Sequence, residues 1–265
     1  MLRPSGCIDA DKTITFNFKK GGIDVFKALS RALTSRSGPI LTGVAVGILA
    51  PLLTFWGNPG NMGICVACFT RDIAGALGLH RAATVQYIRP ELAGFILGSF
   101  ISSLIYGEYK PRTGSSPIVR FFLGFFAMIG ALVFLGCPWR AYIRLSAGDL
   151  NAIPGIVGLA IGIVIGIAFL WHGFSLGRNY PAKKALGYIM PAVAMTLLVF
   201  VLLRPSFGPE GASAIFFSKE GPGSMAAPVA LSLLVGLLVG FLAQRSRFCT
   251  VGALRDLIMF KDFHL

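Results

Sequence analysis

The sequence predicts an all-α integral membrane protein with about six spanning helices and several short re-entrant half-helices. Three observations predict this class. The 265 residues are 55% hydrophobic and only 13% charged, with a mean hydropathy of +0.74. Long uncharged runs approach the length that a helix needs to cross about 30 Å of hydrocarbon. A cysteine motif that occurs twice indicates two related halves, predicted to be inverted repeats of which the second is incomplete.

Six uncharged runs are the candidates for spanning helices. They cover 38–56, 92–106, 121–136, 152–171, 185–203 and 226–243. The run 92–106 is the shortest, so we expect Pro90 and Glu91 to form its first turn. A carboxylate in a first turn is favourable to the helix dipole, which is the simplest interpretation of Glu91.

The net charge of +13 does not indicate a nucleic-acid partner, because the basic residues lie in short loops and in the N-terminal tail. With the tail on the cytoplasmic side, the inside segments carry 15 Lys and Arg and the outside segments carry 7. The inside segments are 1–37, 107–120, 172–184 and 244–247, and the outside segments are 57–91, 137–151 and 204–225. The positive-inside rule therefore favours a cytoplasmic N-terminus. We expect a multi-pass protein of the plasma (cell inner) membrane.

Four regions follow from this pattern. The tail 1–37 has no signal-peptide h-region, and Ile23, Phe26, Leu29 and Leu33 predict an amphipathic helix on the inner leaflet. We expect a first membrane repeat over 38–175, a connecting helix and loop over 176–225, and the start of a second repeat over 226–265.

Two segments do not fit simple spanning. Residues 57–61 break the helix before the short apolar stretch 62–79, and residues 136–140 end a span before a short piece at 141–145. Irregular backbone at membrane depth is tolerated only where protein or a water-filled cavity satisfies its polar groups. We therefore expect both segments to be re-entrant and to line the interior of the bundle.

The repeated motif is a cysteine followed six residues later by Arg-Asp. Cys65 precedes Arg71-Asp72, and Cys249 precedes Arg255-Asp256. Five predicted spans separate the two cysteines, if both short segments re-enter without crossing. Because this number is odd, one cysteine segment enters from each side of the membrane. Broken helices in corresponding positions of two halves are typical of a transporter's binding site.

Cysteine thiols at these helix breaks suggest a site for a soft anion. Cys65, Cys137 and Cys249 are the candidate substrate pathway, with Cys68 beside them. A thiol is a weak donor and a soft acceptor, so thiols can contact a sulfur- or selenium-bearing anion loosely enough for conduction. Half-helix N-termini add partial positive charge. The auxiliary candidates are Arg71, Arg140 and Arg255, although the adjacent aspartates neutralise part of this charge in the two Arg-Asp pairs.

Two alternatives stay open. Cys65 and Cys68 form a CxxC, which is typical of a membrane thiol-disulfide oxidoreductase; against this, Gly252 occupies the position that corresponds to Cys68. A non-transporting membrane subunit of selenium metabolism is the second alternative. A path for copper or another soft cation is disfavoured by the basic loops. No zinc-type ligand spacing, phosphate loop, dinucleotide loop or nucleophile elbow occurs, so we expect no metal, no cofactor and no enzyme activity.

Glycines four residues apart predict close helix packing within the bundle. They are Gly43/Gly47, Gly94/Gly98, Gly158/Gly162/Gly166 and Gly236/Gly240. A phenylalanine-rich face, in contrast, predicts packing or lipid contact and not a ligand site. It consists of Phe121, Phe122, Phe125 and Phe126.

Several motifs together resemble the YeeE/YedE family of membrane proteins. They are residues 61–65 (NMGIC), 136–140 (GCPWR) and 245–252 (RSRFCTVG), and the stretch 57–91 is most similar to the selenium-associated YedE branch. The resemblance covers nearly the whole chain from Gly38 onward. It implies an inverted-repeat bundle whose cysteines, here Cys65, Cys137 and Cys249, pass thiosulfate or a selenium compound toward the cytoplasm. It also implies a TusA-like sulfur-carrier protein as a partner.

The chain departs from the family pattern in its last part. Members carry a second Gly-Cys-Pro segment, which the spacing of 72 between Cys65 and Cys137 puts at about position 321. The resemblance therefore leads us to expect a chain incomplete at its C-terminus, with one face of the first half uncovered.

Overall fold

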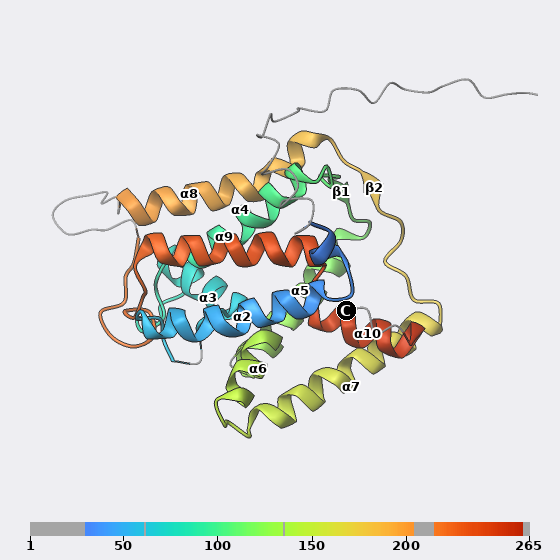
Figure 1. The fold of residues 1–265 in the computed structure, drawn as a ribbon, viewed down its shortest axis with the longest axis horizontal. Helices are drawn as coiled ribbons and strands as arrows, with labels where there is room; N and C mark the ends of the chain where they lie inside the picture. The colour runs from blue at the N-terminus through green and yellow to red at the C-terminus, as the bar shows by residue number, and fades with distance from the viewer. Residues whose placement is uncertain (1–29, 61, 135, 204–214, 262–265) are drawn as a thin grey trace, which may run out of the picture.

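The computed structural model describes residues 30–60, 62–134, 136–203 and 215–261, and their regular secondary structure is almost entirely helical (Figure 1). The main helices are α2 (Gly38–Phe55), α3 (Val66–Ala76), α4 (Pro90–Ile105), α5 (Pro117–Val133), α6 (Pro138–Ser146), α7 (Ala152–Trp171), α8 (Ile189–Leu203), α9 (Val229–Ser246) and α10 (Thr250–Phe260). A 3₁₀ turn, η1 (Lys184–Tyr188), precedes α8. The strands β1 (Arg112–Thr113) and β2 (Tyr180–Pro181) form a small antiparallel ladder.

Five helices of the described chain are long and apolar enough to cross a membrane. Two of these apolar stretches include the half-helices α6 and α10, and the others contain α2, α7 and α8. The sixth predicted span is α4, which has 16 residues and does begin at Pro90, with Glu91 in its first turn. The prediction of a helical multi-pass membrane protein is confirmed at this level.

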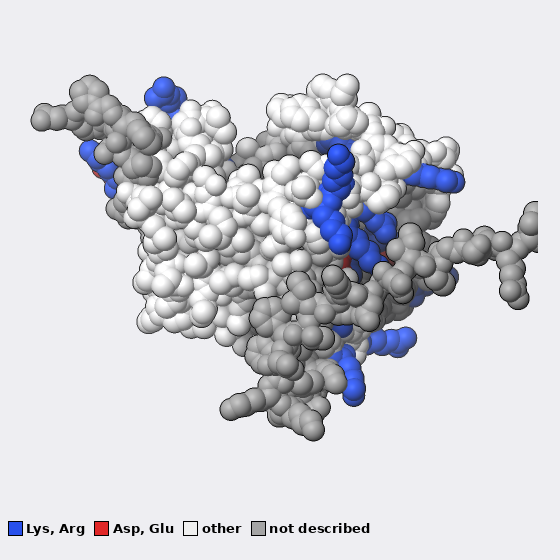
Figure 2. Space-filling model, turned by 90° about the horizontal axis from the view of Figure 1, so that it is seen from above, with Lys and Arg blue, Asp and Glu red and all other residues white. Residues whose placement is uncertain are grey.

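The two ends of the bundle group the loops as the charge pattern predicts. At one end, the β1–β2 ladder joins 107–120 to 172–184, and Arg245 contacts Glu108. At the other end, Gly223 donates its backbone N–H to Thr84 and Ala227 donates to Asn58. Figure 2 shows an uncharged face between basic groups at the two ends. This is the surface expected of a protein that crosses a bilayer, because charges are costly in hydrocarbon.

Helices α2 and α9 lie antiparallel. Thr42 near the start of α2 donates a hydrogen bond to Ser246 at the end of α9, at 2.8 Å. Asn58, just beyond the end of α2, accepts from the backbone N–H of Ala227, just before α9. The half-helices that follow α2 and α9, namely α3 and α10, are therefore attached at opposite ends of this pair.

Helix α4 packs along α9 through two pairs of glycines. A Cβ atom on Gly94 or Gly98 would collide with the backbone of α9, and one on Gly236 or Gly240 would collide with the backbone of α4. The predicted close approach is therefore correct for α4 and α9. Such an approach brings the two backbones into van der Waals contact, which holds helices together in lipid.

The glycines four residues apart on α7 do not pack closely against another described helix. Nothing lies within 4 Å of a Cβ atom added at Gly158, Gly162 or Gly166. Gly47 of α2 is equally open, and Gly43 meets only the ring of Phe248. The prediction was wrong for α7, because a row of small residues permits an approach without supplying a neighbour.

One further prediction needs adjustment. The second short helix begins at Pro138, directly after Cys137, and not at Ala141, because proline is well suited to a first helical position. Most of the predicted amphipathic tail helix lies outside the described residues; within them, Leu33 is buried. The phenylalanine face of α5 is exposed, as expected for lipid contact.

Candidate functional site

A cysteine occupies the N-cap position of each half-helix. Cys65 precedes α3, Cys137 precedes α6 and Cys249 precedes α10, and all three have extended backbones. The first N–H groups of a helix have no partner inside that helix, so each cysteine stands at a positive dipole end. Of the three, the Cys249 sulfur accepts a hydrogen bond from its own half-helix, whereas Cys65 and Cys137 make no such cap contact. The sequence predicted cysteines at helix breaks, and the structure adds that they are the caps.

Three thiols come together at the first of these positions. Cys65 and Cys68 are almost completely buried and form a cluster with Met62 and Ala67, against which Cys137 and Met128 pack. All of these cysteines are free thiols.

Cys137 lies beside the N-terminus of α3. Cys137 makes no cap hydrogen bond to its own helix, and it packs against the cluster that contains Cys65, the N-cap of α3, and Ala67 of its first turn. The partial positive ends of α3 and α6 therefore meet at the same group of thiols. Backbone donors at helix N-termini are well suited to stabilise an anion, and here soft sulfur atoms surround them.

Arg140 contributes the positive side chain of this cluster. Its Nη1 donates to the sulfur of Cys68 at 3.1 Å, and its Nε is buried without a hydrogen-bond partner. Among the described residues, no carboxylate lies within salt-bridge distance of Arg140. Its charge is therefore available to a ligand, in contrast to that of the Arg-Asp pairs.

Cys249 lies apart from the three clustered thiols. It is exposed, and its sulfur accepts a hydrogen bond from the backbone N–H of Gly252 at 3.3 Å. Its neighbour Phe248 contacts Trp139, with ring centroids 5.6 Å apart, and Trp139 is two residues from Cys137. The predicted pathway residues Cys65 and Cys137 are thus brought together with Cys68, whereas Cys249 is connected to them through aromatic side chains.

The first Arg-Asp pair is part of a buried charge network. Asp72 accepts from Arg71 at 2.7 Å and from Arg89 at 2.9 Å, and both Asp72 and Arg89 are fully buried. Arg89 also donates to the carbonyl oxygens of Met225 and Pro222. Asp72 therefore fixes α3 to the start of α4 and to the loop before α9. No sequence pattern singles out Arg89, since only its burial distinguishes it from other loop arginines.

The second Arg-Asp pair has a surface position. Arg255 contacts Asp256 at 2.7 Å, and their side chains are 51% and 22% exposed. The described residues supply no further ion-pair partner to either side chain. The predicted neutralisation of each arginine by its aspartate agrees with both contacts.

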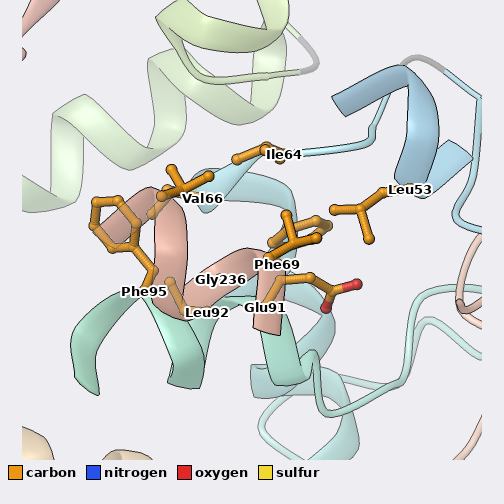
Figure 3. A pocket seen from close by; sticks show the side chains of 10 residues that line it. Leu53, Ile64, Val66, Phe69, Glu91, Leu92, Phe95 and Gly236 are labelled. Carbon is orange, nitrogen blue, oxygen red and sulfur yellow. The ribbon is translucent and has the colours of Figure 1, made fainter. Parts of the chain in front are cut away.

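Glu91 is buried, although the sequence suggested only a first-turn charge. Its Oε1 accepts hydrogen bonds from Asn58 and from Ser232, each at 2.8 Å, whereas Oε2 has no partner in the described part of the chain. Figure 3 shows the Glu91 carboxylate near Phe69 and directed toward the part of the cavity where Leu53 lies. Asn58 stands in a predicted helix break, but no sequence signal connected it to Glu91.

A small apolar cavity adjoins Glu91, with room for about one water molecule. Its other lining residues are Leu53, Ile64, Val66, Phe69, Leu92, Phe95, Val235, Gly236 and Val239 (Figure 3). Val66 and Phe69 come from the first turns of α3, whose neighbouring residues Cys65 and Cys68 carry the thiols. The cavity and the thiol cluster therefore share one half-helix.

Within the described residues, no group of three or more His, Cys, Asp or Glu side chains has the arrangement of a metal site. A scan against protein-family models finds no match, and searches of curated proteins and of solved structures find no similar chain.

Proposed function

We propose that this protein transports a small sulfur- or selenium-containing anion of the thiosulfate type across the plasma membrane. The observation that carries this proposal is the meeting of three thiols, two half-helix N-termini and Arg140, which has no carboxylate partner among the described residues, inside a bundle of apolar helices. The soft end of such an anion contacts the thiols, and its charged oxygens face Arg140 and the backbone N–H groups.

The contacts are weak individually, which suits conduction. A site on a transport path must attract its ligand and also release it. Thiols bind without a covalent step, and the aromatic link from Trp139 to Phe248 leads from the cluster to Cys249. In this proposal, Cys65 and Cys137 form the central site, Cys68 and Arg140 assist it, and Cys249 is a later contact toward the cytoplasm. Arg71 and Arg255 hold their half-helices in place.

The antiparallel α2–α9 pair supports two inverted repeats, each consisting of a spanning helix, a capping cysteine and a half-helix. The excess of basic residues at the end that contains 107–120 and 172–184 supports a cytoplasmic position for that end. A TusA-like carrier on that side is the proposed acceptor of the transported sulfur.

Uptake of radiolabelled thiosulfate into proteoliposomes tests the function. We expect Cys137→Ala to lower uptake at least about tenfold, because it removes a central soft contact, worth about 1.4 kcal/mol or more. Arg140→Gln should lower uptake of the anion by a similar factor. The matched control is Ser146→Ala on the same half-helix. Unchanged uptake after replacement of Cys65, Cys137 and Cys249 together would contradict the thiol site.

The packing of Cys65 and Cys68 in one buried cluster also favours a second candidate, a membrane thiol-disulfide oxidoreductase. That function requires a reversible disulfide between the two residues. Cys68→Ser abolishes such chemistry but leaves two of the three thiols for an anion. Strong residual transport by Cys68→Ser supports the transporter, and complete loss together with a trapped Cys65–Cys68 disulfide in the wild type supports the oxidoreductase.

A further inference from the structure

The β1–β2 ladder holds two basic loops side by side. Arg112 pairs with Pro181, and the backbone N–H of Ala182 donates to the carbonyl oxygen of Pro111 at 3.0 Å. Side-chain hydrogen bonds extend this connection on both sides of the paired residues. Two segments that lie far apart in the chain are therefore fixed against each other.

The register of this ladder places like charges next to each other. Continued by two residues beyond Arg112, it sets Lys110 opposite Lys183. Because the pair that includes Ala182 is hydrogen-bonded, the next pair is of the kind whose side chains approach more closely. Arg112 lies on the same face of its strand as Lys110, since the side-chain period of a strand is two. Like charges opposite each other destabilise an antiparallel pair, and an anion between them removes this cost.

The described residues supply no carboxylate to balance this charge. We call the exposed basic residues of the two segments the basic ladder; they are Lys110, Arg112, Arg120, Arg178, Lys183 and Lys184. None of them forms a salt bridge within the described chain. The segments 107–120 and 172–184 contain one acidic residue, Glu108, and it is already paired with Arg245 and Arg247.

The basic ladder adjoins the ends of apolar helices. Helix α5 begins at Pro117, soon after β1, and η1 and α8 follow β2. Two exposed aromatic side chains belong to the same region, since Trp171 at the end of α7 is 66% exposed and Tyr180 in β2 is 61% exposed. Tryptophan and tyrosine are enriched where a membrane meets water. Both features place the basic ladder at the level of the lipid headgroups.

An exposed apolar face begins beside the basic ladder. The Nε of Arg120 donates to the carbonyl oxygen of Ser115 at 2.8 Å, and the hydroxyl of Ser115 donates to Leu176. These contacts attach the first turn of α5 to the segment before β2. The next residue, Phe121, is the first of the phenylalanine face of α5, whose four rings are exposed. Cationic side chains next to an exposed apolar face match a molecule with an anionic head and apolar chains.

We propose that the basic ladder binds an anionic phospholipid. The phosphate group lies among Lys110, Arg112 and Lys183, and the acyl chains lie along the phenylalanine face of α5. Clusters of Lys and Arg at the end of a membrane helix attract anionic lipids, by about fivefold in affinity for each charge. An acidic protein satisfies the charges equally well but leaves the aromatic and phenylalanine side chains without a partner. The site does not depend on the identity of the transported solute.

Native mass spectrometry of the purified protein tests the site. The protein is mixed in detergent with equal amounts of phosphatidylglycerol and phosphatidylcholine, and the ratio of the two lipid adducts is measured. We expect phosphatidylglycerol to predominate on the wild type. Lys110→Gln and Lys183→Gln should each lower the ratio by about fivefold, and together by about 25-fold.

The matched control is Lys219→Gln, which makes the same change at an exposed position near the other end of the bundle, where the adjacent Ser218 contacts Gln86. It should keep the ratio of the wild type. A ratio that is unchanged in the double variant, or lowered equally by Lys219→Gln, would overturn the proposal.

Thermal unfolding in detergent gives a second measurement, in which the sign of the effect depends on the lipid. Without anionic lipid, the double variant lacks a like-charge repulsion, so its Tm should equal or exceed that of the wild type. With phosphatidylglycerol, the wild type binds the lipid more tightly and should have the higher Tm. A double variant with a lower Tm than the wild type under both conditions would show a structural role of the lysines and overturn the proposal.

Two further probes distinguish a phospholipid from other anions. Inorganic phosphate supplies the anionic group without acyl chains, and polyglutamate imitates an acidic protein. We expect each to raise the Tm of the wild type less than phosphatidylglycerol does. An equal or larger rise with phosphate would indicate a site for a free anion, and one with polyglutamate would indicate a protein-docking surface. Either result would overturn the assignment to a lipid.

Discussion

The half-helices α3 and α10 begin with the same motif but have different environments. Cys65 and Asp72 are buried, and Arg89, Cys137 and α5 surround them. On α10, Cys249 is exposed and no residue is buried. The motif alone therefore supplies a capping thiol and a local ion pair. A binding site arises only where other segments cover the half-helix and bring further thiols and charges to it.

The rows of glycines four residues apart likewise differ in whether another helix covers them. On α4 and α9 they interlock with the facing backbone, whereas on α7 they meet nothing within 4 Å. Glycines four residues apart allow a close helix contact, but the contact forms only where another helix packs against them. The same substitution made once in a covered motif and once in an uncovered motif measures how much the packed neighbour contributes to the free energy of unfolding.

The largest expected effect is at the two aspartates. Asp72→Asn leaves the buried Arg89 without its charge partner, and breaking a buried pair of this kind costs about 3–5 kcal/mol. Asp256→Asn removes an exposed pair and should cost less than about 0.5 kcal/mol. Unfolding of the purified proteins in detergent by denaturant compares the two. Equal losses of stability would mean that the environments of α3 and α10 are energetically alike.

The sequence predicts the local features of this protein but not the contacts between residues that are far apart in the chain. Hydropathy and charge predict the spans and the grouping of loops, because the bilayer imposes them on the local sequence. The helix breaks and capping cysteines are local as well. Arg89 and the Asn58–Glu91–Ser232 contacts depend on packing between residues far apart in the chain, and no local pattern specifies them. For that reason Glu91 was predicted as a first-turn residue but not as a buried one.

An intermediate effect is expected at the glycines. A Cβ atom at Gly98 collides with the Leu237 backbone, so Gly98→Ala should cost about 1–3 kcal/mol through overpacking. Gly162→Ala enters open space on α7 and should stabilise the helix by up to about 1 kcal/mol, since alanine is the better helix former. Thermal unfolding in detergent gives both values. Destabilisation by Gly162→Ala would show that α7 has a close neighbour in the assembled protein.

The smallest effect concerns the capping thiols themselves, where the two copies should respond with opposite signs. Serine is a better N-cap than residues with weak acceptors, so Cys249→Ser should strengthen the contact with the Gly252 N–H and stabilise α10 by about 0.5 kcal/mol. Cys65 makes no side-chain cap hydrogen bond and lies among thiols and apolar groups. The hydroxyl of Cys65→Ser therefore enters a site without a good partner, which costs about 1 kcal/mol. Stabilisation by both substitutions would show that the α3 N-terminus is as open to a capping acceptor as that of α10, and the thiol cluster would then not be closed around Cys65.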